Sequence, residues 1–304
     1  MPLWLLLAAG LAADTARSVQ IPVARGESLH VVTFGHGGGE PVVLIPGFFG
    51  SAFSFRKVVP LLAQAGYQPI VVEPLGTGFS SRPEHGDYSL SAQARRIAAT
   101  LDSLHVRHAW VIGHAVGGAM ALRFAYTRPD LVAALVSLEG GPTEEVATPE
   151  LRSVARYIPW IKLLGGIKVI RRVLRGTLKA SSGDTSWITE GVVFGYTAGT
   201  AANVNGTLKA YLAMAASREH EPLQPHLHEI TCPVRLVLGG ARHDGGVASE
   251  EVAELQRSLR SFVVDTVPGA GHYLQEERPE AVVAALEETR RSALPRRRAE
   301  TVRN

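Results

Sequence analysis

The sequence contains a single cysteine, Cys232, among 304 residues, so no disulfide can form within the chain. Cys232 stands at the start of a predicted strand, where a small core residue is expected. Cysteine usage therefore does not indicate a compartment. Long apolar runs are also scarce. The uncharged stretch over residues 3–13 is too short to cross a bilayer as a helix.

Several patterns that would indicate other functions are missing. No paired carboxylates or phosphate-binding loop occur, so glycoside hydrolysis and phosphoryl transfer lack support. His220, His226 and His228 do not have the spacing of a metal site, and neither a metal nor a cofactor is predicted. The basic C-terminus has no interleaved aromatic residues that could stack on bases, which argues against a nucleic-acid partner.

The two ends of the chain differ from the rest. Residues 290–304 hold six arginines against one glutamate, so this segment carries +5 while the remainder carries −2. The tail is predicted to be solvated, with contact to an anionic lipid surface as the alternative. Residues 3–13 resemble the apolar part of a secretory signal, although no Lys or Arg precedes them. We expect an exported (periplasmic or secreted) or membrane-associated protein, against the alternative of a cytoplasmic protein whose N-terminus packs on the domain.

From residue 29 onward, short apolar runs alternate with amphipathic stretches of helical length. The predicted strands are residues 31–34, 41–46, 70–72, 110–112, 131–138, 234–238 and 262–267. The predicted helices are residues 54–65, 91–104, a helix from 116 onward, 249–259 and 279–286. This alternation predicts an α/β fold with a mostly parallel central sheet that is covered by helices on both faces.

The alternation stops once, because residues 142–225 contain several amphipathic helical segments but no convincing strand. We therefore predict one α/β domain interrupted by an inserted helical cap. The predicted division is a signal or anchor segment (1–16), the first part of the core (17–141), the cap (142–225), the second part of the core (226–292) and a basic tail (293–304).

The glycine-rich segment 113–118, Gly-His-Ala-Val-Gly-Gly, lies between a predicted strand and a predicted helix. Glycines are needed in so tight a turn, and the residue at its apex, Ala115, is expected to be strained. The apex faces the carboxyl ends of the strands, where open α/β sheets bind their ligands. The spacing matches the nucleophile elbow Gly-x-Ser-x-Gly at every position except the serine.

Four further segments accompany this turn, two before it and two after it in the sequence. They are Ile-Pro-Gly-Phe-Phe-Gly (45–50), Glu-Pro-Leu-Gly-Thr-Gly-Phe-Ser (73–80), Leu-Gly-Gly-Ala-Arg-His-Asp (238–244) and Gly-Ala-Gly-His (269–272). With the elbow, they resemble the motifs of the α/β-hydrolase family, specifically its cap-bearing branch of esterases, lipases and carbon–carbon bond hydrolases. The resemblance covers residues 29–140 and 230–290. It departs from the family at Pro46, where a histidine is usual, and at Ala115.

The resemblance assigns a role to each site residue. His272 would be the general base, and Asp244 would orient it and stabilise its charged form. The backbone N–H groups of Phe48 and Val116 would form the oxyanion hole, which does not depend on the side chain of Pro46. One extra residue separates Gly240 from Asp244 compared with the usual spacing. His114 is expected to pack and hydrogen-bond under the turn.

Ala115 leaves three explanations open, because a methyl group cannot attack a carbonyl carbon. The natural chain could have serine at 115. Alanine could instead be native, with His272 and Asp244 performing cofactor-free acid–base chemistry on a carbonyl substrate. The protein could also be a non-catalytic ligand-binding or interaction module. Ser51 and Ser54 are offset from the apex and are not expected to replace the nucleophile.

The predicted cap should determine what binds. Its basic amphipathic segment 160–179 is expected to pack its apolar side on the domain, with contact to an anionic membrane surface as the alternative. Other apolar residues are predicted to form the roof of a pocket: Trp187, Val192, Val193, Phe194, Tyr196, Tyr211, Leu212 and Met214. The predicted partner is a small apolar acyl ester or related carbonyl compound.

Overall fold

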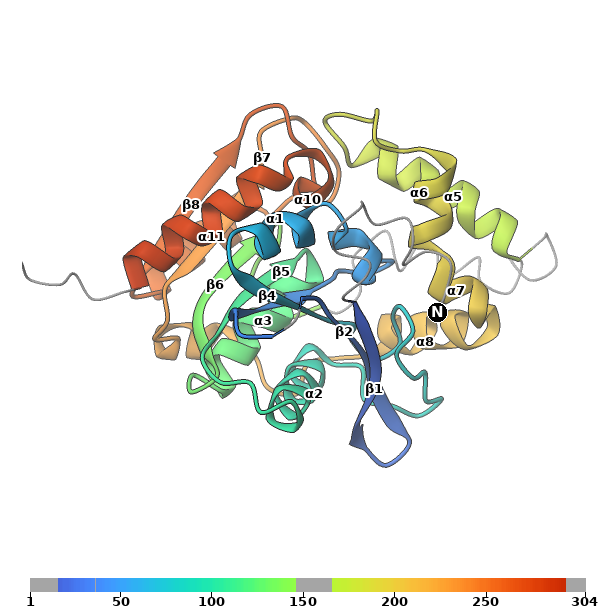
Figure 1. Cartoon of the computed structure of the whole chain (residues 1–304), viewed down its shortest axis with the longest axis horizontal. Helices are drawn as coiled ribbons and strands as arrows, with labels where there is room; N and C mark the ends of the chain where they lie inside the picture. Colours follow the sequence, from blue (N-terminus) through green and yellow to red (C-terminus); the bar gives the residue numbers. More distant parts are fainter. Residues whose placement is uncertain (1–15, 36, 146–165, 294–304) are drawn as a thin grey trace, which may run out of the picture.

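A mostly parallel sheet forms the centre of the protein in the computed structural model, which describes residues 16–35, 37–145 and 166–293 (Figure 1). The order of its strands is β1-β2-β4-β3-β5-β6-β7-β8. The strands are β1 (Arg17–Ala24), β2 (Glu27–Thr33), β3 (Glu40–Ile45), β4 (Tyr67–Val72), β5 (Ala109–His114), β6 (Val132–Leu138), β7 (Val234–Gly239) and β8 (Phe262–Val267). The α/β prediction and the mostly parallel sheet are confirmed.

The N-terminal edge of the sheet departs from the parallel pattern. β1 pairs with β2, and β2 pairs with β4, both in antiparallel register. β1 was not among the predicted strands because its residues are mostly exposed, so no apolar run marks it. The chain turns from β1 to β2 at Gly26, whose φ of 76° suits glycine.

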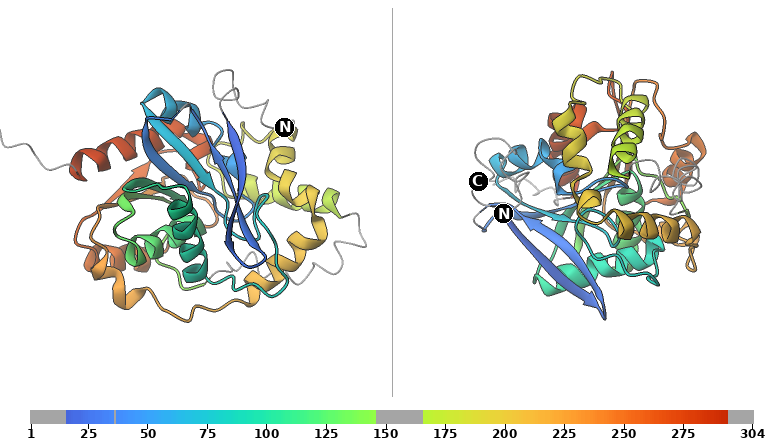
Figure 2. Two further views of the ribbon diagram at one scale, coloured as in Figure 1. Left: turned by 60° about the horizontal axis from the view of Figure 1, so that its bottom comes forward. Right: turned by 90° about the vertical axis from the view of Figure 1, so that its right-hand side faces the viewer.

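Helices cover both faces of the sheet (Figures 1 and 2). One face packs against α2 (Leu90–Ser103) and α3 (Val116–Thr127), and the other against α1 (Val58–Gln64) and α11 (Pro279–Ala293). Because both faces are covered, the central strands are mostly apolar, and β5 is buried at every position. The remaining helical elements of the core are η3 (Ala52–Phe55), η4 (Gln224–Glu229), α9 (Ser249–Ser258) and α10 (Leu274–Glu277).

A helical block lies between β6 and β7, as the sequence predicts. Its described helices are α5 (Ile167–Ala180), α6 (Glu190–Tyr196), α7 (Ala198–Ala202) and α8 (Val204–Ala216). Figure 1 shows them on one side of the molecule, beyond the ends of the strands. α5 buries Ile170, Leu174 and Leu178 within the protein while Lys168 and Arg172 are exposed. Its apolar side therefore packs on the protein, as expected.

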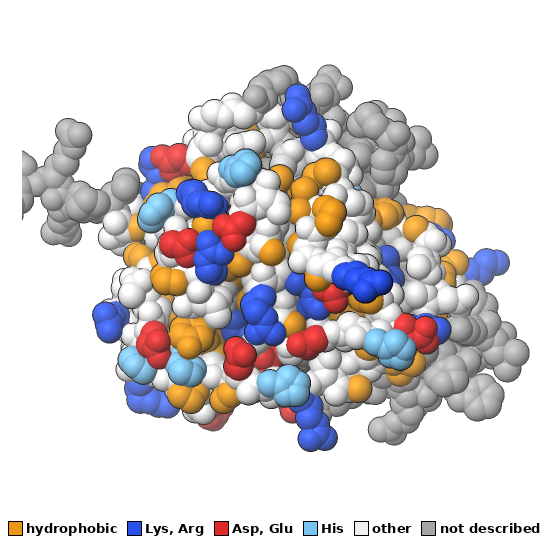
Figure 3. Space-filling view, turned by 90° about the horizontal axis from the view of Figure 1, so that it is seen from below, with side chains coloured by type: hydrophobic (Ala, Val, Ile, Leu, Met, Phe, Trp, Pro, Cys, Tyr) orange, Lys and Arg blue, Asp and Glu red, His pale blue; other side chains and the backbone are white. Residues whose placement is uncertain are grey.

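Parts of three expectations fall outside the described residues. These are the apolar stretch 3–13, the beginning of the basic cap segment and most of the arginine-rich tail. No described helix has the length and apolar character needed to cross a membrane. On the face seen in Figure 3, acidic and basic side chains are interspersed, so this face has no large region of one sign.

Candidate functional site

The turn between β5 and α3 holds Ala115 in a strained backbone conformation, with φ of 50° and ψ of −123°. A positive φ at a residue other than glycine costs on the order of 1–3 kcal/mol. The flanking glycines are sterically required. A Cβ on Gly113 would lie 2.5 Å from the carbonyl oxygen of Gly117, and one on Gly117 would lie 2.3 Å from that of Ile45. The strained apex predicted from the glycine pattern is therefore present.

The two predicted oxyanion donors, Phe48 and Val116, line one cavity together with Ala115. Neither backbone N–H donates to another backbone group within the residues that the structure describes. Val116 begins α3, so its N–H lies at the positive end of the helix dipole. The arrangement can therefore bind an oxygen that carries partial negative charge.

Glu73 holds the Phe48 loop in place. Its carboxylate is fully buried and accepts hydrogen bonds from the backbone N–H groups of Ala52 (2.8 Å) and Phe79 (2.6 Å). A Cβ on Gly78 would lie 2.0 Å from a Glu73 oxygen, so this turn also requires glycine. The motif over residues 73–80 thus has a structural role: it fixes the loop that carries Phe48, the predicted oxyanion donor.

His272 and His114 pack edge to face, with ring centroids 4.8 Å apart. His114 donates from Nε2 to the backbone carbonyl of His272 (3.0 Å), as expected for a residue under the turn. Burial lowers the pKa of His114 to about 4 and lowers the pKa of His272 well below its usual value. Both rings are therefore neutral at pH 7, and the same burial makes His272 a weaker base than a free imidazole.

Asp244 lines the cavity, but its side chain is exposed. The Nδ1 atom of His272 is buried and has no hydrogen-bond partner in the described part of the chain, so the predicted pairing with Asp244 is not formed. His243 points inward instead, with only 7% of its side chain exposed. The extra residue after Gly240 thus turns a histidine toward His272 and the aspartate toward solvent.

The carboxylate beside these histidines is Glu139, which the sequence analysis did not single out. It follows β6 directly, has a φ of 52°, and exposes only 1% of its side chain. Its Oε2 lies 3.5 Å from Nε2 of His243, and burial raises its pKa. A glutamate followed by two glycines at the end of an apolar strand is the signal that could have identified it.

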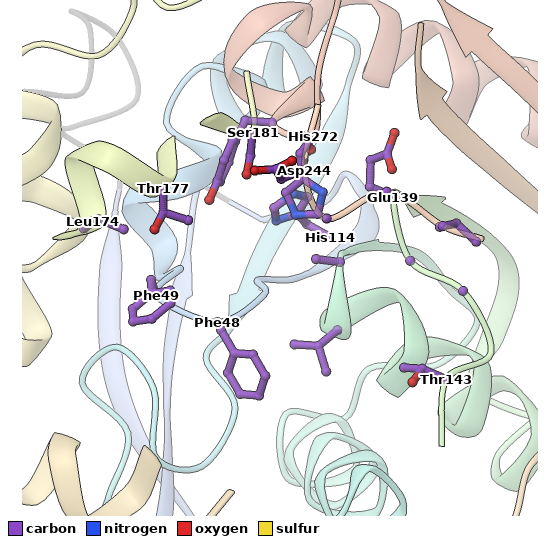
Figure 4. A pocket seen from close by; sticks show the side chains of 18 of the residues that line it. Phe48, Phe49, His114, Glu139, Thr143, Leu174, Thr177, Ser181, Asp244 and His272 are labelled. Atoms are coloured by element: carbon purple, nitrogen blue, oxygen red, sulfur yellow. Dashed lines mark hydrogen bonds between the residues drawn. The ribbon is translucent and has the colours of Figure 1, made fainter. Parts of the chain in front are cut away.

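A cavity of about 280 Å³ connects these groups. In Figure 4, His114, His272 and Asp244 gather on one side, Phe48 and Phe49 lie on another, and Glu139 lies beside the histidines. The cap contributes apolar side chains to the wall: Ile170, Val173 and Leu174 of α5, and Leu208 and Tyr211 of α8. The cavity is thus mainly apolar with a few polar groups near Ala115.

The predicted roof is wrong in most of its residues, since only Tyr211 lines the cavity. Phe194 and Leu212 are exposed, and Met214 packs in the main core. The others pack with one another and with Phe53 and Tyr273 in a separate cluster: Trp187, Val192, Val193 and Tyr196. The face that a short helix turns to the cavity depends on its packing, which composition does not determine.

Known proteins share this architecture. A family model described as the alpha/beta hydrolase fold matches residues 40–160. An uncharacterised hydrolase of Bacillus subtilis, YugF, is 27% identical over 84% of this chain and 92% of its own length. The 2-(acetamidomethylene)succinate hydrolase of Mesorhizobium japonicum is 28% identical over 92% of this chain and 97% of its own.

A solved structure gives the same result for the fold. A serine-to-alanine mutant of the meta-cleavage product hydrolase from Pseudomonas fluorescens IP01, complexed with acetates, superposes with a TM-score of 0.71 at 22% identity. The superposed region covers 92% of this chain and 99% of the hydrolase chain. With the strand order, the strained turn at Ala115 and the two sequence matches to hydrolases, this similarity leads to one conclusion: the chain has the α/β-hydrolase fold.

Proposed function

We propose that the cavity binds an apolar acyl ester or related carbonyl compound, with the carbonyl oxygen between the backbone N–H groups of Phe48 and Val116. The observation that carries this proposal is the pair of backbone donors, both without backbone partners, in a largely apolar cavity beside Ala115. The apolar part of a substrate would lie against Ile170 and Leu174. The carbonyl carbon would then face the methyl group of Ala115.

Ala115 has no lone pair, so this chain cannot form an acyl-enzyme at the elbow. The chain as it stands is therefore proposed to bind its ester without turning it over by that route. The remaining site resembles that of an ester hydrolase without its nucleophilic oxygen and without an acid bound to Nδ1 of the histidine. This applies whether alanine is the native residue or a replacement.

A second candidate function is cofactor-free acid–base chemistry, and the neutral state of His272 favours it. A neutral imidazole can take a proton from water or from the carbon beside a carbonyl, while the two N–H donors stabilise the resulting negative charge. Activity of the unmodified chain that disappears in His272→Ala would support this candidate. Binding with no turnover in any variant would instead indicate a ligand-binding protein.

Filling the cavity with a large side chain should weaken ligand binding. Thr177 lines the cavity near the end of α5, and Thr177→Trp is expected to weaken the binding of ethyl hexanoate by at least about tenfold, because the indole occupies the ligand's volume. Isothermal titration calorimetry in the presence of EDTA would measure the affinity. Lys179→Trp, at an exposed position on the same helix, is the matched control. Equal affinities in the two variants would refute the cavity as the binding site.

Asp244 is expected to contribute little to catalysis. In a chain carrying Ala115→Ser, Asp244→Asn should change kcat/KM for an ester by less than about tenfold, because the exposed Asp244 does not contact Nδ1 of His272. Loss of a true triad aspartate costs about 10⁴-fold in kcat. A loss of that size would show that Asp244 pairs with His272 during turnover.

A further inference from the structure

Three buried side chains, one of them His272, converge beside the cavity. Glu139, His243 and His272 each offer one side-chain ligand atom, and these three atoms lie within 4.8 Å of one another. Oε2 of Glu139, Nε2 of His243 and Nδ1 of His272 are buried and make no hydrogen bond of good geometry in the described part of the chain, although the backbones of Val247 and Gly245 lie close to Glu139 and His272. The three side chains come from three different segments, namely the end of β6, the loop after β7 and the loop after β8. A buried atom of this kind is costly unless something binds it.

The hydrogen bonds of His243 determine which of its ring nitrogens faces Glu139. Its Nδ1 lies 2.7 Å from the carbonyl oxygen of Ala241, which can only accept, so Nδ1 carries the hydrogen. In the neutral ring, Nε2 then presents a lone pair toward the Glu139 carboxylate, 3.5 Å away. Two acceptors that face each other in a buried site repel, and either a proton or a metal cation between them removes the repulsion.

We propose that Glu139, His243 and His272 bind one divalent transition-metal ion of the Zn²⁺ type. Two imidazoles and one carboxylate are a common ligand set for such ions. Tetrahedral ligands at about 2.1 Å from zinc are about 3.4 Å apart. The Glu139–His243 separation of 3.5 Å already fits, and the ligand atom of His272 lies within 4.8 Å of both.

The surroundings of the three ligands support the same conclusion. Metal-binding histidines usually donate their second N–H to a backbone carbonyl, as His243 does to Ala241. Glu139 accepts a hydrogen bond at its other oxygen, Oε1, from the N–H of Gly239, which fixes the carboxylate and leaves Oε2 for the ion. The ligands are thus oriented before any ion binds.

The loop over the cluster leaves space for a further ligand. A Cβ on Gly246 would lie 3.4 Å from Nε2 of His243 and 3.6 Å from Oε2 of Glu139, and glycine has no such atom. Gly246 also lines the cavity. A bound ion could therefore take a water or ligand oxygen from the cavity side. The spacing of histidines along the sequence could not reveal this site, because its ligands lie about a hundred residues apart or on separate loops.

Direct binding measurements test the proposal without any substrate. The full chain is dialysed against EDTA, freed of chelator and titrated with ZnCl₂ by calorimetry, and the retained zinc is counted by mass spectrometry. We expect one zinc per chain. Glu139→Gln and His243→Gln should each weaken binding by at least about 100-fold, because each removes one of three ligands. Zinc should raise the melting temperature of the original chain but not of these variants.

A surface pair on the same chain supplies the matched control. Nδ1 of His226 lies 2.7 Å from Glu229 at an exposed position, so His226→Gln and Glu229→Gln alter the same residue types without touching the cluster. Zinc affinity should stay within about twofold in these variants. Circular dichroism checks that each variant folds. If a cluster variant does not fold, His272→Gln replaces it and leaves the Glu139–His243 pair intact.

Two outcomes would overturn the proposal. One is the absence of stoichiometric zinc binding, which would indicate that a proton shared by Glu139 and His243 stabilises the cluster. The other is binding that all cluster variants retain, which would place the zinc elsewhere. Neither outcome bears on ester binding, which is measured with EDTA present, so the two proposals fail independently.

Discussion

Ala115→Ser is expected to raise the hydrolysis of a medium-chain p-nitrophenyl ester by at least about 10³-fold over the unmodified chain. Removal of a catalytic serine from a serine hydrolase costs about 10⁶-fold in kcat, and the oxyanion hole and binding account for most of what remains. The structure retains those remaining parts: the donors at Phe48 and Val116, and the neutral ring of His272. Restoring one oxygen should therefore recover a large share of the rate.

The backbone at position 115 is already suited to serine. The turn holds Ala115 at a φ of 50°, and alanine gains no functional benefit from a conformation that costs free energy. The added hydroxyl oxygen would project from the same Cβ that now lines the cavity with His272. The expected gain is set at 10³-fold rather than 10⁶-fold because the structure shows no acid bound to Nδ1 of His272.

Two control variants separate nucleophilic catalysis from other effects. Ala115→Gly changes the same position without adding an oxygen and should leave the rate unchanged. Ala115→Ser combined with His272→Ala should lose most of the gain, because the serine hydroxyl then has no base. Stopped-flow measurement should show a burst of p-nitrophenol equal to the enzyme concentration. A serine variant no faster than the glycine variant would contradict the proposed acyl-enzyme site.

The sequence predicts the strained turn at Ala115 and the central strands well because local sterics and burial encode them. The turn at 113–118 requires glycines at fixed positions, and its neighbours approach within 2.5 Å of where a Cβ would lie. The apolar strands on both sides are recognisable because both faces of the sheet are buried. These features are properties of short segments, so a short segment is enough to detect them.

Features that depend on packing between segments were not predicted. Glu139 is next to His243 because β6 and β7 are neighbours in the sheet, a pairing that no local pattern specifies. One extra residue before Asp244 decides whether a histidine or an aspartate faces His272, and spacing alone does not give the direction of a side chain. β1 was missed because an exposed edge strand has few apolar residues to mark it.

Arg123 is expected to be among the most important residues for stability. It lies on α3 with only 1% of its surface exposed, and its guanidinium binds Glu144 and lies 3.5 Å from Glu219. Glu144 also accepts hydrogen bonds from the N–H groups of Leu223 (2.8 Å) and Gln224 (3.1 Å). Arg123 therefore joins the chain on both sides of the helical block to the helix that follows the nucleophile position.

Arg123→Ala should lower the free energy of unfolding by about 3–5 kcal/mol, because it removes the positive charge beside the Glu219 carboxylate, which is only 4% exposed and keeps only its hydrogen bonds from Leu90 and Ser91. Burial lowers the pKa of Arg123, and the carboxylates of Glu144 and Glu219 oppose this shift because they stabilise the charged guanidinium. The measurement is urea denaturation at pH 7, followed by far-ultraviolet circular dichroism. The midpoint should fall while the dependence on urea stays unchanged.

Arg128, at the end of the same helix, provides the matched control because it too contacts two carboxylates. It lies 2.7 Å from both Asp102 and Asp130, but all three side chains are at least 30% exposed. Water and salt screen such a pair, so Arg128→Ala should produce little measurable change in the midpoint. Equal losses in the two variants would mean that burial of Arg123 does not govern its contribution. A large loss in Arg123→Ala alone would instead show that a desolvated ion pair secures the cap region to the catalytic core.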